Sequence, residues 1–277
     1  MVRNLAKYGA KGTAVIARAV FVHASETELK ALVDVGMNID EETTRSSMWT
    51  QRDHPTTALG LALTRGYEDE MRVLLRLGAN PTYRMSNGTP VLHKLGPGTT
   101  YEAYRLLAFV EPMTTENGET VAHAAVRCQV KCERLLEALM DPLPARLDGR
   151  TPMHICAETG NWETASFIFD LYVTRHSSYN LCHARDQYGW APLATALQQP
   201  ANSYPFFDGF RANGADPFAT DADGRSLLHL AIRDEREIAV EWLLDCGARD
   251  IGDIRSISNV RIVQMLTDHG VVRERSV

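Results

Sequence analysis

Residues 148–160 read DGRTPMHICAETG, and this stretch contains a turn, a helix start, one apolar helix face and a helix stop. Gly149 suits a turn in which the backbone adopts a positive φ. Thr151 is a good N-cap, and Pro152 then stands at the first helical position, where its missing N–H costs nothing. The pattern therefore predicts a helix that begins at Thr151 and ends at Gly160.

A second helix is predicted directly after Gly160, because Ala165, Ile168 and Phe169 recur at helical spacing. Each helix should have about eight to ten residues, fewer than the roughly twelve to fifteen that an isolated helix needs for marginal stability. Such a pair of helices holds its shape only when it stacks on neighbouring pairs.

The same pattern recurs in residues 223–250, DGRSLLHLAIRDEREIAVEWLLDCGARD. Here Gly224 is the turn glycine, Ser226 starts the helix, and His229 takes the place that His154 has in the first stretch. The pattern resembles the ankyrin repeat, whose consensus joins Gly-x-Thr-Pro-Leu-His to a second helix that ends in Leu-Leu-x-x-Gly-Ala. The resemblance implies an all-α, ankyrin-type solenoid of stacked helix-turn-helix repeats, with hairpin loops and terminal caps.

The length of 277 residues leaves room for roughly seven or eight units of about 33 residues each. Copies that begin near residues 57, 148 and 223 match well, and those near residues 87, 116 and 186 are degenerate. The third copy should have a short first helix, because Gly96-Pro97-Gly98 interrupts it. We predict a single array over residues 1–277, with an N-terminal capping repeat at 1–40, repeats at 53–250, and a C-terminal cap helix and tail at 251–277.

Residues 1–24 include basic residues and no acidic residue, a composition typical of a targeting presequence. We favour a capping repeat for this segment, because Arg18 interrupts the apolar run at residues 14–22 and the run leads directly into a degenerate repeat. The run is also too short to span a membrane, and no transmembrane segment is evident in the sequence. The five cysteines form no paired CxxC motifs, which favours a reduced compartment, cytoplasmic or nuclear.

Four histidines share one position of the repeat: His93, His123, His154 and His229. The resemblance implies a structural role for them, since this histidine makes hydrogen bonds between neighbouring turns in the ankyrin family. Side chains that occur once per repeat cannot converge on one metal ion. Cys128 and Cys132 lie one helical turn apart near His123 and could hold a metal, but no fourth ligand is evident. We therefore predict no metal and no cofactor.

The sequence contains no nucleophile elbow, phosphate-binding loop or metalloprotease helix. The net charge of −6 and the lack of a basic stripe argue against a nucleic-acid ligand. A stacked array presents a long concave strip, which suits a protein partner. We predict a non-catalytic, monomeric protein–protein interaction scaffold with no nucleic-acid or membrane partner. The alternative is an atypical enzyme or small-molecule binder with a pocket at the irregular sixth repeat and the insertions.

In ankyrin proteins the residues beside the turn glycine, and those near the end of the first helix, face the concave strip. The candidate partner-binding residues carried over on this basis are Arg150, Glu158, Tyr188, Trp190, Arg225 and Asp234. Tyr188 and Trp190 are large amphipathic aromatics near arginines, a composition that is common in binding hot spots. Trp190 has an alternative role, which is to cover the neighbouring turn.

Three stretches exceed the repeat length and could carry function: residues 40–55 with Trp49, residues 171–185, and residues 198–210. The second stretch is expected to lengthen a helix. In the third, Pro200 and Pro205 are expected to prevent a regular pair of helices. Its aromatic side chains are expected in the core, with an exposed aromatic anchor as the alternative.

Overall fold

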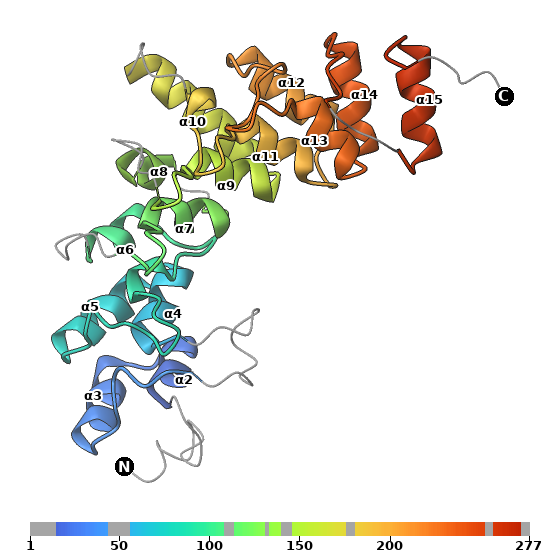
Figure 1. Cartoon of the computed structure of the whole chain (residues 1–277). Coiled ribbons are helices and arrows are strands. Elements are labelled where there is room, and N and C mark those ends of the chain that lie inside the picture. The colour runs from blue at the N-terminus through green and yellow to red at the C-terminus, as the bar shows by residue number, and fades with distance from the viewer. Residues whose placement is uncertain are drawn as a thin grey trace. The chain divides into compact units, whose positions relative to one another are not determined.

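The computed structural model describes residues 15–43, 56–107, 114–130, 133–139, 146–175, 181–252 and 257–272. In these ranges the regular elements are helices, joined by turns that include two isolated β-bridges. The predicted all-α repeat fold is confirmed. The chain divides into two compact units, Met1–Pro144 and Ala145–Val277 (Figure 1). The single array over residues 1–277 therefore stays a prediction. Residues 1–14, Trp49 and Cys132 lie outside the described ranges.

The first unit consists of pairs of short helices. These pairs are α2 (Val15–Phe21) with α3 (Glu26–Asp34), α4 (Ala58–Arg65) with α5 (Glu68–Arg76), the 3₁₀ helix η1 (Val91–His93) with α6 (Tyr101–Arg105), and α7 (Val121–Arg127) with α8 (Glu133–Leu139). The first helices pack on one another, α2 against α4, and η1 against both α4 and α7. The second helices form another layer, in which α3, α5, α6 and α8 pack in that order.

The short first helix predicted for the third repeat is confirmed, because η1 has only three residues. The glycine-rich segment after η1 packs tightly against the end of α4. A Cβ on Gly98 would lie 3.0 Å from the carbonyl oxygen of Arg65, and the hydroxyl of Thr99 donates to the carbonyl oxygen of Leu63 across 2.9 Å. Because the glycine-rich segment ends η1 early, the loop at residues 96–99 can contact the carbonyl oxygens of Leu63 and Arg65 at the end of α4.

The second unit contains α9 (Pro152–Thr159) with α10 (Trp162–Arg175), the 3₁₀ helix η2 (Leu181–His183), α11 (Pro192–Gln198) with α12 (Tyr204–Ala212), α13 (Leu227–Arg233) with α14 (Glu237–Asp245), and α15 (Val260–Asp268). Helices α9, α11 and α13 form the layer of first helices, and α12, α14 and α15 pack in sequence as second helices. Helix α10 runs on to Arg175, which confirms the expected lengthening.

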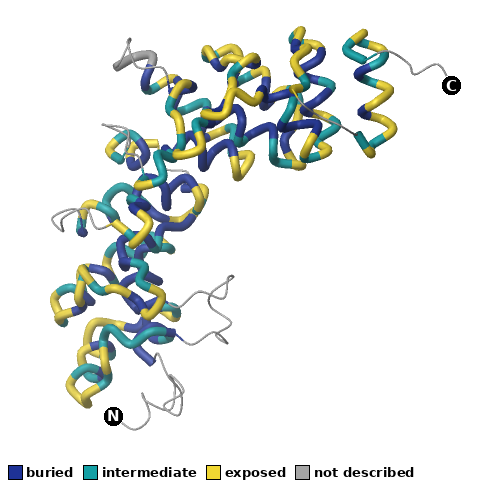
Figure 2. Tube along the Cα trace, viewed as in Figure 1, coloured by how far each residue is buried: buried dark blue, intermediate teal, exposed yellow. Residues whose placement is uncertain are grey.

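First helices are buried on nearly every side, because each is covered by its own second helix and by first helices of neighbouring repeats. In α4 residues 58–63 are all buried, and in α9 residues 152–157 are all buried (Figure 2). The start of α9 follows the sequence prediction, with Thr151 as N-cap and Pro152 in the first turn. Gly160 ends the helix in the left-handed conformation at φ 68°.

The prediction that residues 198–210 would not form a regular helix pair was wrong. Ser203 is the N-cap of α12 and Pro205 stands in its first turn, where a missing N–H breaks no helical hydrogen bond. The loop before α12 is fixed by Asn202, which is buried and donates from Nδ2 to the carbonyl oxygens of Ala157 and Ala196, each across 2.9 Å. Two helix ends from neighbouring repeats therefore share one amide group.

The three phenylalanines of α12 pack in the core, as predicted, whereas Tyr204 is only half-buried. Phe206, Phe207 and Phe210 are buried, and the rings of Phe169 and Phe210 meet edge to face with centroids 5.5 Å apart. Trp162, at the start of α10, packs its ring on Gly209 and against Phe206. Aromatic pairs of this kind stabilise a core beyond the area that they bury.

Candidate functional site

Three hairpins of the second unit carry four of the six candidate residues, and they span residues 146–150, 186–190 and 221–225. Glu158 lies in α9, and Asp234 is the C-cap of α13. Backbone hydrogen bonds join them in series: the N–H of Gln187 donates to the carbonyl oxygen of Asp148 across 2.7 Å, and that of Ala222 to Tyr188 across 3.4 Å. Gly189 has φ 82°, and a Cβ there would lie 2.7 Å from the nitrogen of Ala222. The turn glycine is thus required both by its conformation and by the close approach of the next hairpin.

His154 in α9 connects its own repeat to the next hairpin by hydrogen bonds. His154 accepts at Nδ1 from the backbone N–H and the hydroxyl of Thr151, each at 3.0 Å, and donates from Nε2 to the carbonyl oxygen of Trp190 across 3.1 Å. A carbonyl oxygen can only accept, so the neutral Nε2–H tautomer satisfies every partner. Burial lowers the pKa of His154 below its ordinary value. The ring therefore fixes one repeat to the next.

His229 makes the equivalent contact with the opposite nitrogen. Its Nδ1 donates to the carbonyl oxygen of Ile251 across 3.0 Å, while Ser226, the N-cap of α13, donates to the carbonyl oxygen of Asp250 across 2.6 Å.

Within the described ranges, no group of three or more His, Cys, Asp or Glu side chains is placed to hold a metal ion. Likewise, no helix in the described part of the chain is long and apolar enough to cross a membrane.

Two large side chains are exposed at the tips of neighbouring hairpins. Tyr188 is 64% exposed and Leu147 is 82% exposed. The tip of Tyr188 is rigid, because Asp186 accepts through Oδ1 from the backbone N–H groups of Tyr188 and Trp190, each across 2.9 Å. This part of the predicted surface is therefore accessible and held in place by backbone contacts.

Trp190 does not belong to that exposed surface, because only 8% of it is accessible. Its backbone is engaged by Asp186 on one side and by His154 on the other. The burial favours the alternative role that the sequence left open, in which Trp190 covers the neighbouring turn. The sequence pattern could not separate the two roles, since the burial depends on the next repeat.

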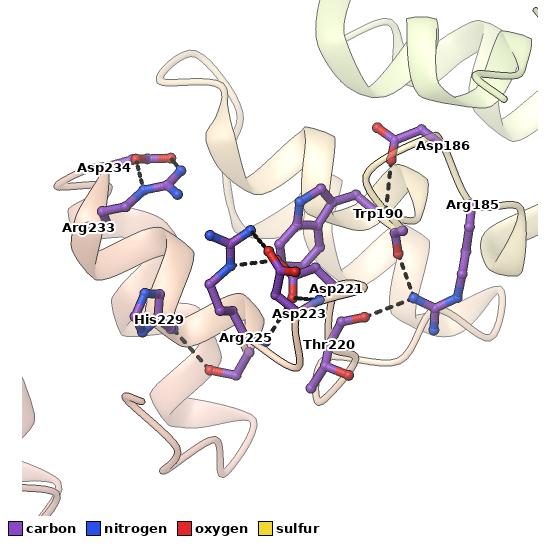
Figure 3. Close-up of polar contacts among 12 residues, drawn as sticks. Arg185, Asp186, Trp190, Thr220, Asp221, Asp223, Arg225, His229, Arg233 and Asp234 are labelled. Carbon is purple, nitrogen blue, oxygen red and sulfur yellow. Dashed lines mark hydrogen bonds and ion pairs between the residues drawn. The ribbon is translucent and has the colours of Figure 1, made fainter. Parts of the chain in front are cut away.

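Arg225 lies between two aspartates of its own hairpin (Figure 3). Its Nε donates to Asp221 across 2.6 Å and its Nη2 pairs with Asp223 across 2.8 Å. The side chain of Asp221 is fully buried and also accepts the backbone N–H groups of Asp223 and Arg225. Arg225 therefore stabilises the third hairpin, a role that the sequence-based assignment did not include.

The remaining candidate charges are also paired within the chain. Arg150 forms an ion pair with Glu158 at 2.8 Å. Asp234 receives two hydrogen bonds from Arg233, at 2.8 and 3.0 Å. Each pair neutralises itself, so these residues contribute less charge to the surface than their sequence positions suggest.

Arg185 is a neighbouring residue that the sequence analysis missed. Its Nη1 donates to the carbonyl oxygens of Gly189, across 2.6 Å, and of Thr220, across 2.8 Å, so it joins two hairpins (Figure 3). A sequence signal for it exists, because Arg84 stands four residues before Gly88 as Arg185 stands four before Gly189. Arg185 also lines a cavity of about 360 Å³ at the base of these hairpins.

Comparison with known proteins agrees with this architecture. The family model of the ankyrin repeat matches residues 223–249. Among solved structures, a chain in the complex of the Bd0816 predatory endopeptidase from Bdellovibrio bacteriovorus with the immunity protein Bd3460 is similar in fold, with a TM-score of 0.51 and 19% identity. The match covers 68% of this chain and 96% of that one. A search of curated proteins gave no match. The chain therefore contains an ankyrin repeat at residues 223–249, within a fold of the helical repeat type.

Proposed function

We propose that the chain is a non-catalytic scaffold that binds a partner protein through the hairpin tips of the second unit. The observation that carries this proposal is the exposure of Tyr188 and Leu147 on adjacent tips that hydrogen bonds hold rigid. Tyrosine offers a large amphipathic surface with little rotamer entropy to lose, which suits a binding anchor. A preorganised backbone lowers the entropic cost of association further.

Two of the six residues assigned from the sequence, Trp190 and Arg225, do not suit a binding surface. Trp190 is buried and Arg225 holds its own hairpin, so truncating either side chain would alter the fold together with any binding. Tyr188 and Leu147 contribute little to packing and can be changed with less effect on the fold. They are therefore the residues on which the proposal depends.

The alternative function, an enzyme or small-molecule binder at the sixth repeat, has one feature in its favour, which is the 360 Å³ cavity. No residue from 198–210 lines that cavity. Cys182 does line it, but burial raises the pKa of its thiol to about 12, and the sulfur lies 3.4 Å from the carbonyl oxygen of Asn213. A protonated thiol is a poor nucleophile, so we favour the scaffold over the enzyme.

A monomeric state and a cytoplasmic or nuclear location remain predictions.

The test is to recover a partner protein and to measure its Kd for the wild type, Tyr188→Ala and Leu147→Ser. Truncation of a hot-spot side chain costs about 2 kcal/mol or more, roughly thirtyfold in affinity. The matched control is Phe218→Ala, because Phe218 is 56% exposed but lies outside the hairpin tips. Unchanged affinity in both tip variants, with intact thermal unfolding, would refute the proposed surface.

A further inference from the structure

The cavity at the base of the second and third hairpins joins a cationic group to an apolar wall. Its lining includes the polar residues Arg185, His183 and Asp216, and Trp190, Leu193 and Leu227 provide apolar surface. Its volume of about 360 Å³ falls at the lower end of the range for ligand-binding pockets. The cavity can therefore hold a group of roughly side-chain size.

The guanidinium of Arg185 is fixed in position before any ligand arrives. Both of its described hydrogen bonds leave from Nη1, to the carbonyl oxygens of Gly189 and Thr220. The equivalent Arg84 in the first unit divides the same task between Nη1, which donates to Gly88, and Nη2, which donates to Thr114. Arg185 thus performs the bridging role with one nitrogen, and within the described ranges its Nε and Nη2 donate to no acceptor.

Arg185 also differs from the other arginines of these hairpins in charge pairing. Arg146, Arg150 and Arg225 each form an ion pair with a carboxylate, whereas Arg185 contacts only backbone carbonyl oxygens within the described ranges. Asp216, which also lines the cavity, accepts through Oδ1 from the backbone N–H of Phe218. The cavity therefore presents a guanidinium that carries no carboxylate partner.

We propose that this cavity receives an acidic side chain of the bound partner, with its carboxylate on Nε and Nη2 of Arg185 and its methylene groups against Trp190. A guanidinium and a carboxylate match in geometry as a two-bond pair, and such charge-assisted bonds are among the strongest hydrogen bonds in proteins. The proposal rests on the proposed function, because the same partner contacts Tyr188 at the tip of this hairpin.

The experiment begins with selection of linear peptides from a displayed random library against the intact chain. Selected peptides should be enriched in Asp or Glu. For the best peptide, Kd is measured with the acid and with its amide form, against wild type and Arg185→Gln. We expect the amide substitution to weaken binding to the wild type about thirtyfold and to have almost no effect on Arg185→Gln, because the two changes remove the same contact.

Two further variants separate binding from folding. Ala219→Leu fills part of the cavity and leaves Arg185 in the sequence, so it should weaken the acidic peptide, whereas Ala212→Leu, the same change at an exposed residue, should not. Arg233→Gln is the matched charge control, since Arg233 is paired with Asp234. Each variant is checked by thermal unfolding.

The possible failures are distinguishable. Peptides that depend on Tyr188 but bind Arg185→Gln and Ala219→Leu as tightly as wild type would overturn this inference and leave the proposed surface intact. Peptides that are insensitive to Tyr188→Ala would refute the proposed surface itself. Binding of glutarate in the cavity without binding of any acidic peptide would overturn the inference in favour of a small-molecule acid.

Discussion

The imidazole of His154 donates its Nε2 hydrogen to the carbonyl oxygen of Trp190, 36 residues further along the chain and one repeat away. In His154→Ala this carbonyl oxygen and the N–H of Thr151 would both be left buried without their partner. We expect a loss of about 1–3 kcal/mol in the free energy of unfolding, measured with urea. His183→Ala, at an exposed residue, is the control. A stoichiometric metal that disappears in His154→Ala would contradict the structural role.

Stability should also depend on pH through His154. Its pKa is lowered in the folded chain, chiefly by burial, so the unfolded chain binds a proton more readily. The contribution of the neutral ring is complete above the unfolded pKa of about 6.5 and is lost as the pH falls towards the folded pKa. Between about pH 7.5 and pH 5.5 the wild type should lose more stability than His154→Gln. Parallel curves for the two proteins would show that His154 does not titrate in this way.

Arg225→Ala is expected to destabilise the third hairpin, because it removes the side-chain partner of the buried Asp221. Burial by itself would raise the pKa of Asp221, but hydrogen bonds from the backbone and side chain of Arg225 lower it overall. We expect a cost of about 1–3 kcal/mol above pH 5. Arg233→Ala removes an exposed ion pair and should cost about 0.5 kcal/mol or less. Equal melting temperatures for the two variants would contradict this assignment.

Gly209→Ala should destabilise the second unit even though alanine is the better helix former. The new methyl group would meet the ring of Trp162, and overpacking of this kind costs about 1–3 kcal/mol. The cause is testable with a double-mutant cycle. In a Trp162→Ala background the ring is gone, and Gly209→Ala should then stabilise α12 by up to about 1 kcal/mol. An unchanged cost in that background would rule out the ring as the reason.

The local chemistry of the repeat could be predicted well from the sequence. Gly149, Thr151 and Pro152 act through neighbouring backbone groups, so their roles follow from residue type and spacing alone. The short η1 was predictable for the same reason. The effect of Pro205 was predicted wrongly, because a proline disrupts a helix in its interior but is tolerated in its first turn. Which of the two applies depends on the position of the N-cap, and here the N-cap is Ser203.

Contacts between repeats were harder to predict. Trp190 has the composition of a hot-spot residue, but its exposure is decided by a hairpin that lies 31 or more residues further along the chain. Asn202 stands in a loop that matches no consensus position, yet its amide joins two helix ends. Gly209 in the middle of α12 is a local signal of a close approach, but the sequence does not indicate that Trp162 is the group that approaches.

The hydrogen bond from His154 to the next repeat also limits how such a chain can change its length during evolution. A duplication that copies a whole repeat restores both the imidazole and the carbonyl oxygen at their proper separation. An insertion of one or two residues inside the hairpin at 186–190 would shift the carbonyl oxygen out of reach. Second helices already differ in length: α10 has 14 residues, whereas α12 and α14 have nine each. Inherited length variation should therefore accumulate there.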